Sequence, residues 1–140
     1  MSNDTIRFSV AMPEELLERF DAFVERRGFG TNRSETVRDL VREALINEEA
    51  TVPGTEVMAT VTIVYDHHAS NVQEKLHNIQ HHHFGMIIAT THVHLDEDSC
   101  LEVIIMRGET TQVHEVASQI LGTKGVKNGG IVVTSTNQMI

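Results

Sequence analysis

The first part of the chain changes from one hydrophobic pattern to another within a few residues. Apolar side chains occupy every second position from Ile6 to Met12, which is typical of a strand with one buried face over residues 5–12. From Pro13 onward the apolar residues follow helical spacing. Gly28 is expected to end the first helix, and a capping box formed by Asn32 and Glu35 is expected to begin the second. The pattern predicts a strand followed by two helices.

The second half has a different order of elements. A polar stretch containing Pro53 and Gly54 predicts a linker over residues 49–56, between a module at 1–48 and a domain at 57–140. In that domain the pattern predicts strands at 57–65, 86–95, 100–107 and 131–136, and helices at 70–83 and 110–121. This βαββαβ order is the ferredoxin-like split unit, an antiparallel sheet with two helices on one face. The chain is therefore predicted to be α+β.

The predicted strand at 5–12 has no local partner, because two helices follow it directly. A strand is not stable with both edges unpaired, so the simplest solution is antiparallel pairing with a second copy of the chain. The polar face of such a ribbon presents Arg7, Ser9 and Ala11 twice, and a two-stranded ribbon fits the DNA major groove. The same face can equally belong to an ordinary dimerisation module whose polar side is only solvated.

Charge and composition refine this picture. The 140-residue chain has a net charge of −9, yet seven of its eight arginines lie in the first 42 residues. DNA binding therefore requires geometry that places a few arginines on one surface. The start of the second helix, at Asn32, Arg33 and Ser34, offers backbone N–H groups to a phosphate. The single cysteine, and the absence of a signal-like or membrane-spanning apolar run, predict a cytoplasmic protein.

Six of the nine histidines lie between His77 and His94. His92 and His94 share a strand face, and Cys100 can return beside them across a short acidic turn. Two imidazoles and a thiolate form three corners of a transition-metal site, and a fourth can come from His77, His81, His82 or His83. Each of these residues alone is more often structural, and spacing does not choose between Zn²⁺, Ni²⁺ and Cu²⁺.

Particular motifs carry a resemblance to known families. Arg7-Phe8-Ser9-Val10, Asn32-Arg33-Ser34-Glu35 and Val37-Arg38-Asp39 resemble the ribbon-helix-helix repressors. From Arg7 to about Ser135 the chain resembles the nickel-responsive repressor family NikR, through Gln80-His81-His82-His83, His92-Val93-His94-Leu95 and Cys100-Leu101-Glu102-Val103.

The resemblance implies a nickel-dependent DNA-binding regulator that represses nickel uptake genes and is not an enzyme. It implies an ACT-type second domain, a homotetramer built from two dimers, and one square-planar Ni(II) per subunit at the tetramer interface. The implied ligands are His92, His94 and Cys100 of one subunit and His81 of a neighbour. The implied DNA contacts are Arg7, Ser9 and the position of Ala11, where family members generally have a hydroxyl residue. Glu35 and Asp39 match acidic residues that bind a further cation.

Three other functions are compatible with parts of the pattern. A ribbon-helix-helix protein with an ACT-like domain can sense an amino acid, but such a site needs no thiolate. An enzyme can use Cys100 as a nucleophile with His92 or His94 as base, but no third orienting group is evident. A nickel store or delivery protein does not need the N-terminal module.

Overall fold

The computed structural model describes residues 4–28, 30–69 and 71–136. The chain divides into two compact units, Met1–Arg42 and Glu43–Ile140. The first unit holds helix α1 (Glu14–Arg26) and the start of helix α2 (Arg33–Glu49). Ser70, the first residue of the third predicted helix, lies outside the described residues. None of the described helices is long and apolar enough to cross a membrane.

The strand predicted over residues 5–12 is absent from the single chain. Residues 4–13 form neither helix nor strand, and the apolar side chains of Ile6 and Phe8 are 84% and 73% exposed. Thr36 is the only buried residue among those described in the first unit. Strand hydrogen bonds require a neighbouring strand, and the described part of this unit contains none. The alternating pattern therefore indicates an apolar strand face that needs a strand from another chain to pair with.

The predicted helix ends in this unit are confirmed. The carbonyl of Pro13 accepts the first helical hydrogen bond from Leu17 N at 3.0 Å, and α1 ends just before Gly28, whose φ is 118°. Asn32 Oδ1 accepts a hydrogen bond from Glu35 N at 2.9 Å, as the capping box predicts for the start of α2. Both ends of α1 and the start of α2 are therefore fixed by local sequence.

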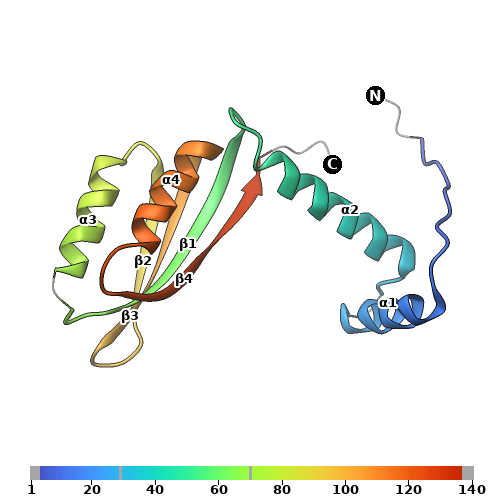
Figure 1. Cartoon of the computed structure of the whole chain (residues 1–140), viewed down its shortest axis with the longest axis horizontal. Coiled ribbons are helices and arrows are strands. Elements are labelled where there is room, and N and C mark those ends of the chain that lie inside the picture. Colours follow the sequence, from blue (N-terminus) through green and yellow to red (C-terminus); the bar gives the residue numbers. More distant parts are fainter. Residues whose placement is uncertain (1–3, 29, 70, 137–140) are drawn as a thin grey trace. The chain divides into compact units, whose positions relative to one another are not determined.

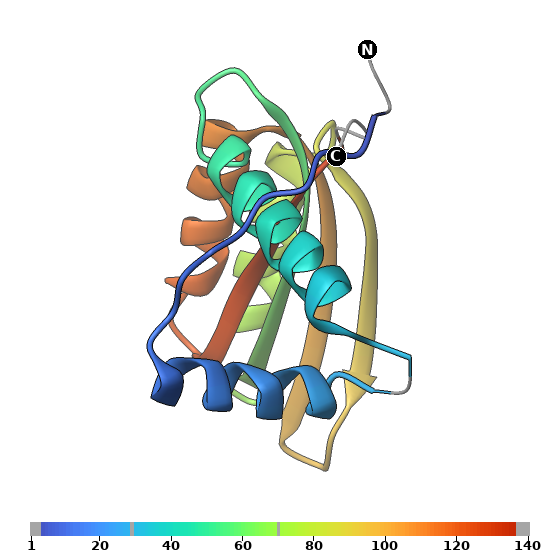
Figure 2. The same cartoon turned by 90° about the vertical axis from the view of Figure 1, so that its right-hand side faces the viewer.

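The second unit has the predicted βαββαβ order (Figure 1). Its elements are β1 (Glu56–Asp66), α3 (Val72–His82), β2 (Ile87–His94), β3 (Ser99–Glu109), α4 (Thr110–Leu121) and β4 (Val126–Ser135). The strands pair antiparallel in the order β2-β3-β1-β4, with β2 and β4 at opposite edges of the sheet (Figure 2). Both helices cover one face of the sheet, and the alternate residues of β1 on that face are buried. The ferredoxin-like prediction is confirmed.

The last strand begins five residues earlier than the predicted start at residue 131. Gly129 and Gly130 were expected to precede it but lie inside it, paired with Ile63 and Thr62 of β1. A Cβ added at Gly129 would lie 2.4 Å from the carbonyl oxygen of Thr62, so only glycine allows this approach of the two strands. Gly129 therefore marks close strand contact in this sheet rather than a turn, whereas an added Cβ at Gly130 would meet open space.

The linker residues between α2 and β1 are held on the second unit. Thr110, at the start of α4, donates from its hydroxyl to the carbonyl of Ala50 and from its N–H to the carbonyl of Thr55 at 2.8 Å. The carboxylate of Glu109 accepts hydrogen bonds from Gly54 N, Thr111 N and Gln112 N at 2.8–3.1 Å. The N–H groups of Gly54 and then Thr111 lower the pKa of Glu109 to about 2. The linker is thus attached by specific hydrogen bonds at the junction of β3 and α4.

We expect Glu109→Ala to lower the melting temperature and to speed amide exchange at Gly54, because one carboxylate caps α4 and holds the linker. The folded-state pKa lies below the ordinary value of 4.5, so the stabilisation is present above pH 4.5 and is lost as pH falls toward 2. The difference in melting temperature from the wild type should therefore shrink over that range. Glu115→Ala, an exposed change on the same helix, is the control. Equal stability of both variants at pH 7 would contradict the proposed anchor.

Candidate functional site

His92 and His94 stand on the same face of the edge strand β2. Their partners on β3 are Glu102 and Cys100, so the two imidazoles lie over the face of the sheet that α3 and α4 cover. Both histidines are exposed, because β2 has no strand on its outer side, whereas Cys100 is fully buried. The predicted alternation and the return of Cys100 across the turn are both present.

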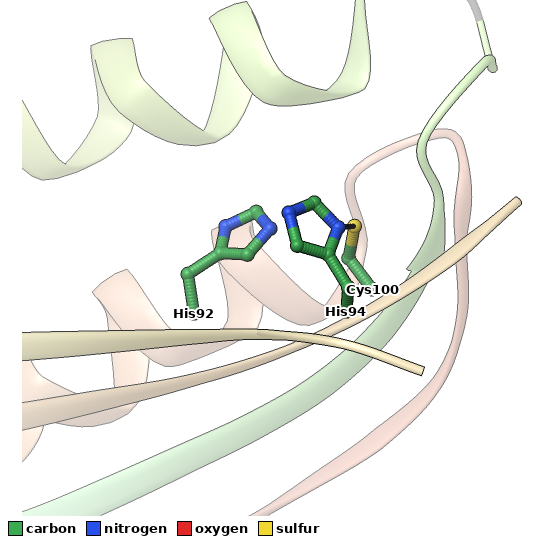
Figure 3. A group of neighbouring side chains, drawn as sticks. All are labelled: His92, His94 and Cys100. Carbon is green, nitrogen blue, oxygen red and sulfur yellow. Dashed lines mark hydrogen bonds between the residues drawn. The ribbon is translucent and has the colours of Figure 1, made fainter. Parts of the chain in front are cut away.

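The ligand atoms of His92, His94 and Cys100 all lie within 4.8 Å of one another. The two imidazole rings have centroids 5.1 Å apart, and His94 Nδ1 lies 3.6 Å from Cys100 Sγ. Figure 3 shows both rings on one side of β2, with the thiol sulfur beside the ring of His94. No other group of three or more histidine, cysteine or carboxylate ligands meets this distance among residues 4–28, 30–69 and 71–136.

The turn between β2 and β3 fixes this arrangement. Asp96 Oδ1 accepts hydrogen bonds from Asp98 N at 2.8 Å and from Ser99 N at 2.7 Å, and these bonds lower the pKa of Asp96. Leu95 N donates to the carbonyl of Ser99 at 2.9 Å. A carboxylate that bonds two successive N–H groups holds a tight turn, which sets the register that brings Cys100 opposite His94.

The chemistry of the donors fits a late transition metal. Burial raises the pKa of the Cys100 thiol, and the negative charges of Glu102 and Asp96 raise it further. The thiol therefore keeps its proton until a cation displaces it. Two imidazoles and a sulfur suit Ni²⁺, Cu²⁺ or Zn²⁺, whereas Mg²⁺ and Ca²⁺ prefer oxygen ligands. The arrangement can hold such an ion and leaves room for a further ligand on the exposed side.

Three further residues lie around this group; sequence reasoning did not single out Tyr65 or Glu102 and left open whether His67 binds metal. Tyr65 OH lies 3.3 Å from His92 Nδ1, and His67 Nδ1 lies 3.5 Å from Cys100 Sγ. Glu102, on the same face of β3 as Cys100, is 8% exposed. Tyr65 lies near the end of β1, where it pairs with Cys100, and His67 follows directly after that strand. The signal that could have found Glu102 is a carboxylate at an inward position of an otherwise apolar strand.

A chain of side-chain hydrogen bonds joins α3 to this part of the sheet. Gln80 Nε2 donates to Glu102 Oε1 at 3.2 Å, and Thr90 Oγ1 donates to Gln80 Oε1 at 2.8 Å. The same residues line a cleft of about 340 Å³ together with Tyr65, Gln73, Leu76, His77 and His92. The position of α3 beside the candidate site is therefore set partly by polar contacts.

His81 does not join His92, His94 and Cys100 within the single chain. It is exposed on α3, and its ring stacks on that of His77 with centroids 6.3 Å apart. The neighbouring His82 is held by its own helix, because His82 Nδ1 lies 2.8 Å from the carbonyl of Asn78. The chain by itself brings three of the four predicted ligands together.

The predicted DNA-contact residues lie on the surface of the first unit. Arg7, Ser9 and Ala11 are exposed. At the start of α2, Ser34 is exposed, Asn32 caps the helix, and Arg33 Nε and Nη2 donate to the carboxylate of Asp21 at 2.7 Å each. The Arg33 guanidinium lowers the pKa of Asp21.

The two residues predicted to bind a second cation also lie on α2. Glu35 is exposed, and its N–H belongs to the Asn32 cap. Asp39 lies between two arginines, 3.7 Å from Arg27 and 3.2 Å from Arg42. In the single chain the charge of Asp39 is therefore balanced by these two arginines.

Comparisons with known proteins agree over most of the chain. A family model described as "NikR C terminal nickel binding domain" matches residues 58–134, and one described as "Ribbon-helix-helix protein, copG family" matches residues 6–48. Relatives from Geobacter sulfurreducens and Pyrococcus abyssi are each 45% identical over 96% of this chain and 96–97% of their own length. A relative from Solibacter usitatus is 46% identical over 93% of both chains. Each is assigned by name as a nickel-responsive regulator.

Proposed function

The chain belongs to the family of nickel-responsive regulators, with a ribbon-helix-helix DNA-binding module and a nickel-binding domain, and from that premise we propose which of its residues bind nickel and which contact DNA. Its nickel site consists of His92, His94 and Cys100 of one subunit and His81 of another. Its DNA-contact surface is the paired strand at residues 5–12. Family membership places the chain among regulators and not among enzymes.

The observation that carries the nickel site is the meeting of two imidazoles and one buried thiol within 4.8 Å. The two histidines of that group stand on β2, an edge strand with no neighbour on its outer side, and Cys100 stands on the adjacent β3. Val93 and Leu95, on and just after that strand, are 45% and 51% exposed. They alternate with the two histidines and so lie on the other face of the strand; an edge with exposed apolar side chains and an incomplete set of ligands favours a subunit interface there. A neighbouring subunit that covers this edge can supply His81, and the resulting assembly is a homotetramer built from two dimers.

The first unit supports dimer formation at the DNA-binding end. Four apolar side chains of residues 6–12 are exposed, and α1 has no buried residue. Antiparallel pairing of two copies supplies the backbone hydrogen bonds of the strand and buries this apolar face. Arg7 and Ser9 of both copies then face outward. The start of α2, at Asn32, Arg33 and Ser34, then faces the DNA backbone. Ala11 offers only a methyl group to the DNA, which suits contact with thymine better than a hydrogen bond.

Nickel and DNA binding are coupled in this proposal. A metal shared between subunits biases how the DNA-binding dimers are arranged, so nickel raises DNA affinity and DNA raises nickel affinity by the same factor. The regulated genes are nickel uptake genes, repressed in the cytoplasm when nickel is bound. Glu35 and Asp39 hold a further cation in the DNA-bound form. The domains divide at 1–48, 49–56 and 57–140.

A subunit-mixing experiment tests the shared site. One parent carries His81→Ala and the other carries His92→Ala with His94→Ala. Neither parent alone can assemble the four ligands, so we expect each to lose nickel to a chelator. Mixed tetramers can combine three ligands of the first parent with His81 of the second. Nickel retention, measured as metal bound per chain after gel filtration with chelator, should therefore reappear in the mixture.

The matched control adds His81→Ala to the second parent, which removes the only donated ligand. That mixture should retain no nickel, although its subunits exchange equally well. Exchange is followed by native mass spectrometry of parents with different mass tags. If mixed tetramers form and nickel is not retained, the fourth ligand is not His81 of another subunit and the proposed site is wrong.

A further inference from the structure

We propose that His77 and His81 form a second transition-metal site on the surface of α3, distinct from the group on β2 and β3. The two rings lie one helical turn apart, with centroids separated by 6.3 Å and planes only 13° from parallel. Both side chains are exposed, so an ion can reach them from solvent.

Helix geometry makes such a pair a chelating unit. Residues at positions i and i+4 lie on one face, one above the other, so two imidazoles at this spacing can bind one ion. The same spacing holds zinc in helices with the H-E-x-x-H motif. Imidazole ligands select late first-row divalent cations, so the site should take Ni²⁺, Cu²⁺ or Zn²⁺ and should ignore Mg²⁺ and Ca²⁺. Two ligands on a surface give weaker binding than a complete four-ligand site.

Two neighbouring polar side chains of α3, His82 and Gln80, already have partners within the chain. His82 Nδ1 lies close to the carbonyl of Asn78, and Gln80 is engaged by Glu102 and Thr90. His77 also lines the cleft that His92 lines from the sheet side. An ion held by His77 and His81 therefore lies beside the cleft that leads toward the candidate nickel ligands.

This placement has a consequence for the shared site, and here the inference rests on the proposed function. If the His81 imidazole completes a nickel site in another subunit, an ion bound by His77 and His81 makes that imidazole unavailable to the other subunit. The two sites then compete for one imidazole. Excess Zn²⁺ should slow nickel loading of the shared site, and this inhibition should depend on His77.

The experiment uses the full chain with the β2–β3 ligands removed: Cys100→Ser, His92→Ala and His94→Ala together. Zn²⁺ and Ni²⁺ binding is measured by equilibrium dialysis, with circular dichroism to verify folding. We expect one ion per chain to remain. Adding His77→Gln should weaken that binding by at least the roughly tenfold that loss of an outer metal partner costs. Adding His82→Gln, the matched control on the same helix, should leave it unchanged.

A second measurement uses the chain with His92, His94 and Cys100 intact. His77→Gln alone should bind one Zn²⁺ fewer per chain at saturation, while its nickel charge-transfer absorption stays the same. Metal binding that is unaffected by His77→Gln in both chains would overturn the inference. Failure of the proposed shared site would show instead in the subunit mixtures, since those do not vary His77.

Discussion

Replacing Cys100 by serine should abolish the sulfur-to-nickel charge-transfer absorption in the near ultraviolet, and with it the gain in DNA affinity that nickel produces. Cys100 is the only cysteine in the chain, so no other thiolate can substitute for it. A serine hydroxyl stays protonated and is a far poorer donor to a late transition metal. The measurements are a nickel titration followed by absorption and a gel-shift assay with and without nickel.

The substitution is small enough to separate metal binding from folding. Cys100 is buried, so its replacement by serine is expected to lower stability, and circular dichroism must show that the sheet is retained. His114→Ala, an exposed histidine change on α4, is the control for unspecific loss of metal ligands. A charge-transfer band that persists in a folded Cys100→Ser protein would exclude this thiolate as a nickel ligand.

The local part of the metal site was predictable because it depends on a single hairpin. Strand periodicity places His92 and His94 on one face whatever the sheet around them does, and the turn at Asp96 returns the chain within a few residues. The register of a short hairpin follows from its turn. Cys100 therefore comes opposite His94 with little dependence on the rest of the fold.

The part of the metal site that comes from β1 could not be predicted in the same way, because it depends on contacts between distant parts of the chain. Tyr65 reaches His92 only because β1 pairs with β3 in the register that sets Tyr65 opposite Cys100. Residues 35 positions apart in sequence meet there, and no local pattern reports that register. The same reasoning applies to Gly129. Its neighbours in the sequence suggest a turn, and only the pairing of β4 with β1 shows that a glycine is needed for the close approach to Thr62.

Two further predictions concern other copies of the chain. The strand expected from Ile6 to Met12 needs a second chain for its hydrogen bonds, so its periodicity correctly indicates an apolar face but not a folded strand in one copy. His81 likewise lies apart from the three clustered ligands within one chain. The local pattern indicates an unpaired apolar strand in the first case and only a missing histidine ligand in the second, where the family resemblance selects His81. The geometry of assembly is not encoded in any single segment.

Replacing Arg7 by alanine should weaken operator binding while nickel binding and dimer formation stay intact. Arg7 is exposed and alternates with the apolar residues Ile6 and Phe8, so pairing of two copies turns it toward the DNA. A bidentate contact to guanine contributes about 1–3 kcal/mol to base discrimination, and each ribbon carries two copies of Arg7. The nickel-loaded variant should therefore lose on the order of tenfold or more in affinity for its operator, measured by fluorescence anisotropy.

Two companion variants distinguish base reading from simple loss of charge. Arg7→Lys keeps the charge but not the planar pair of donors, so it should recover binding to unrelated DNA and little of the operator preference. Arg19→Ala removes one exposed charge from α1 and should change operator affinity much less than Arg7→Ala. Raising the salt concentration should weaken all forms, with a slightly smaller slope for Arg7→Ala because fewer counterions are released. Equal losses for operator and unrelated DNA in Arg7→Ala would identify Arg7 as a phosphate contact, and an unchanged affinity would remove this strand face from the DNA interface altogether.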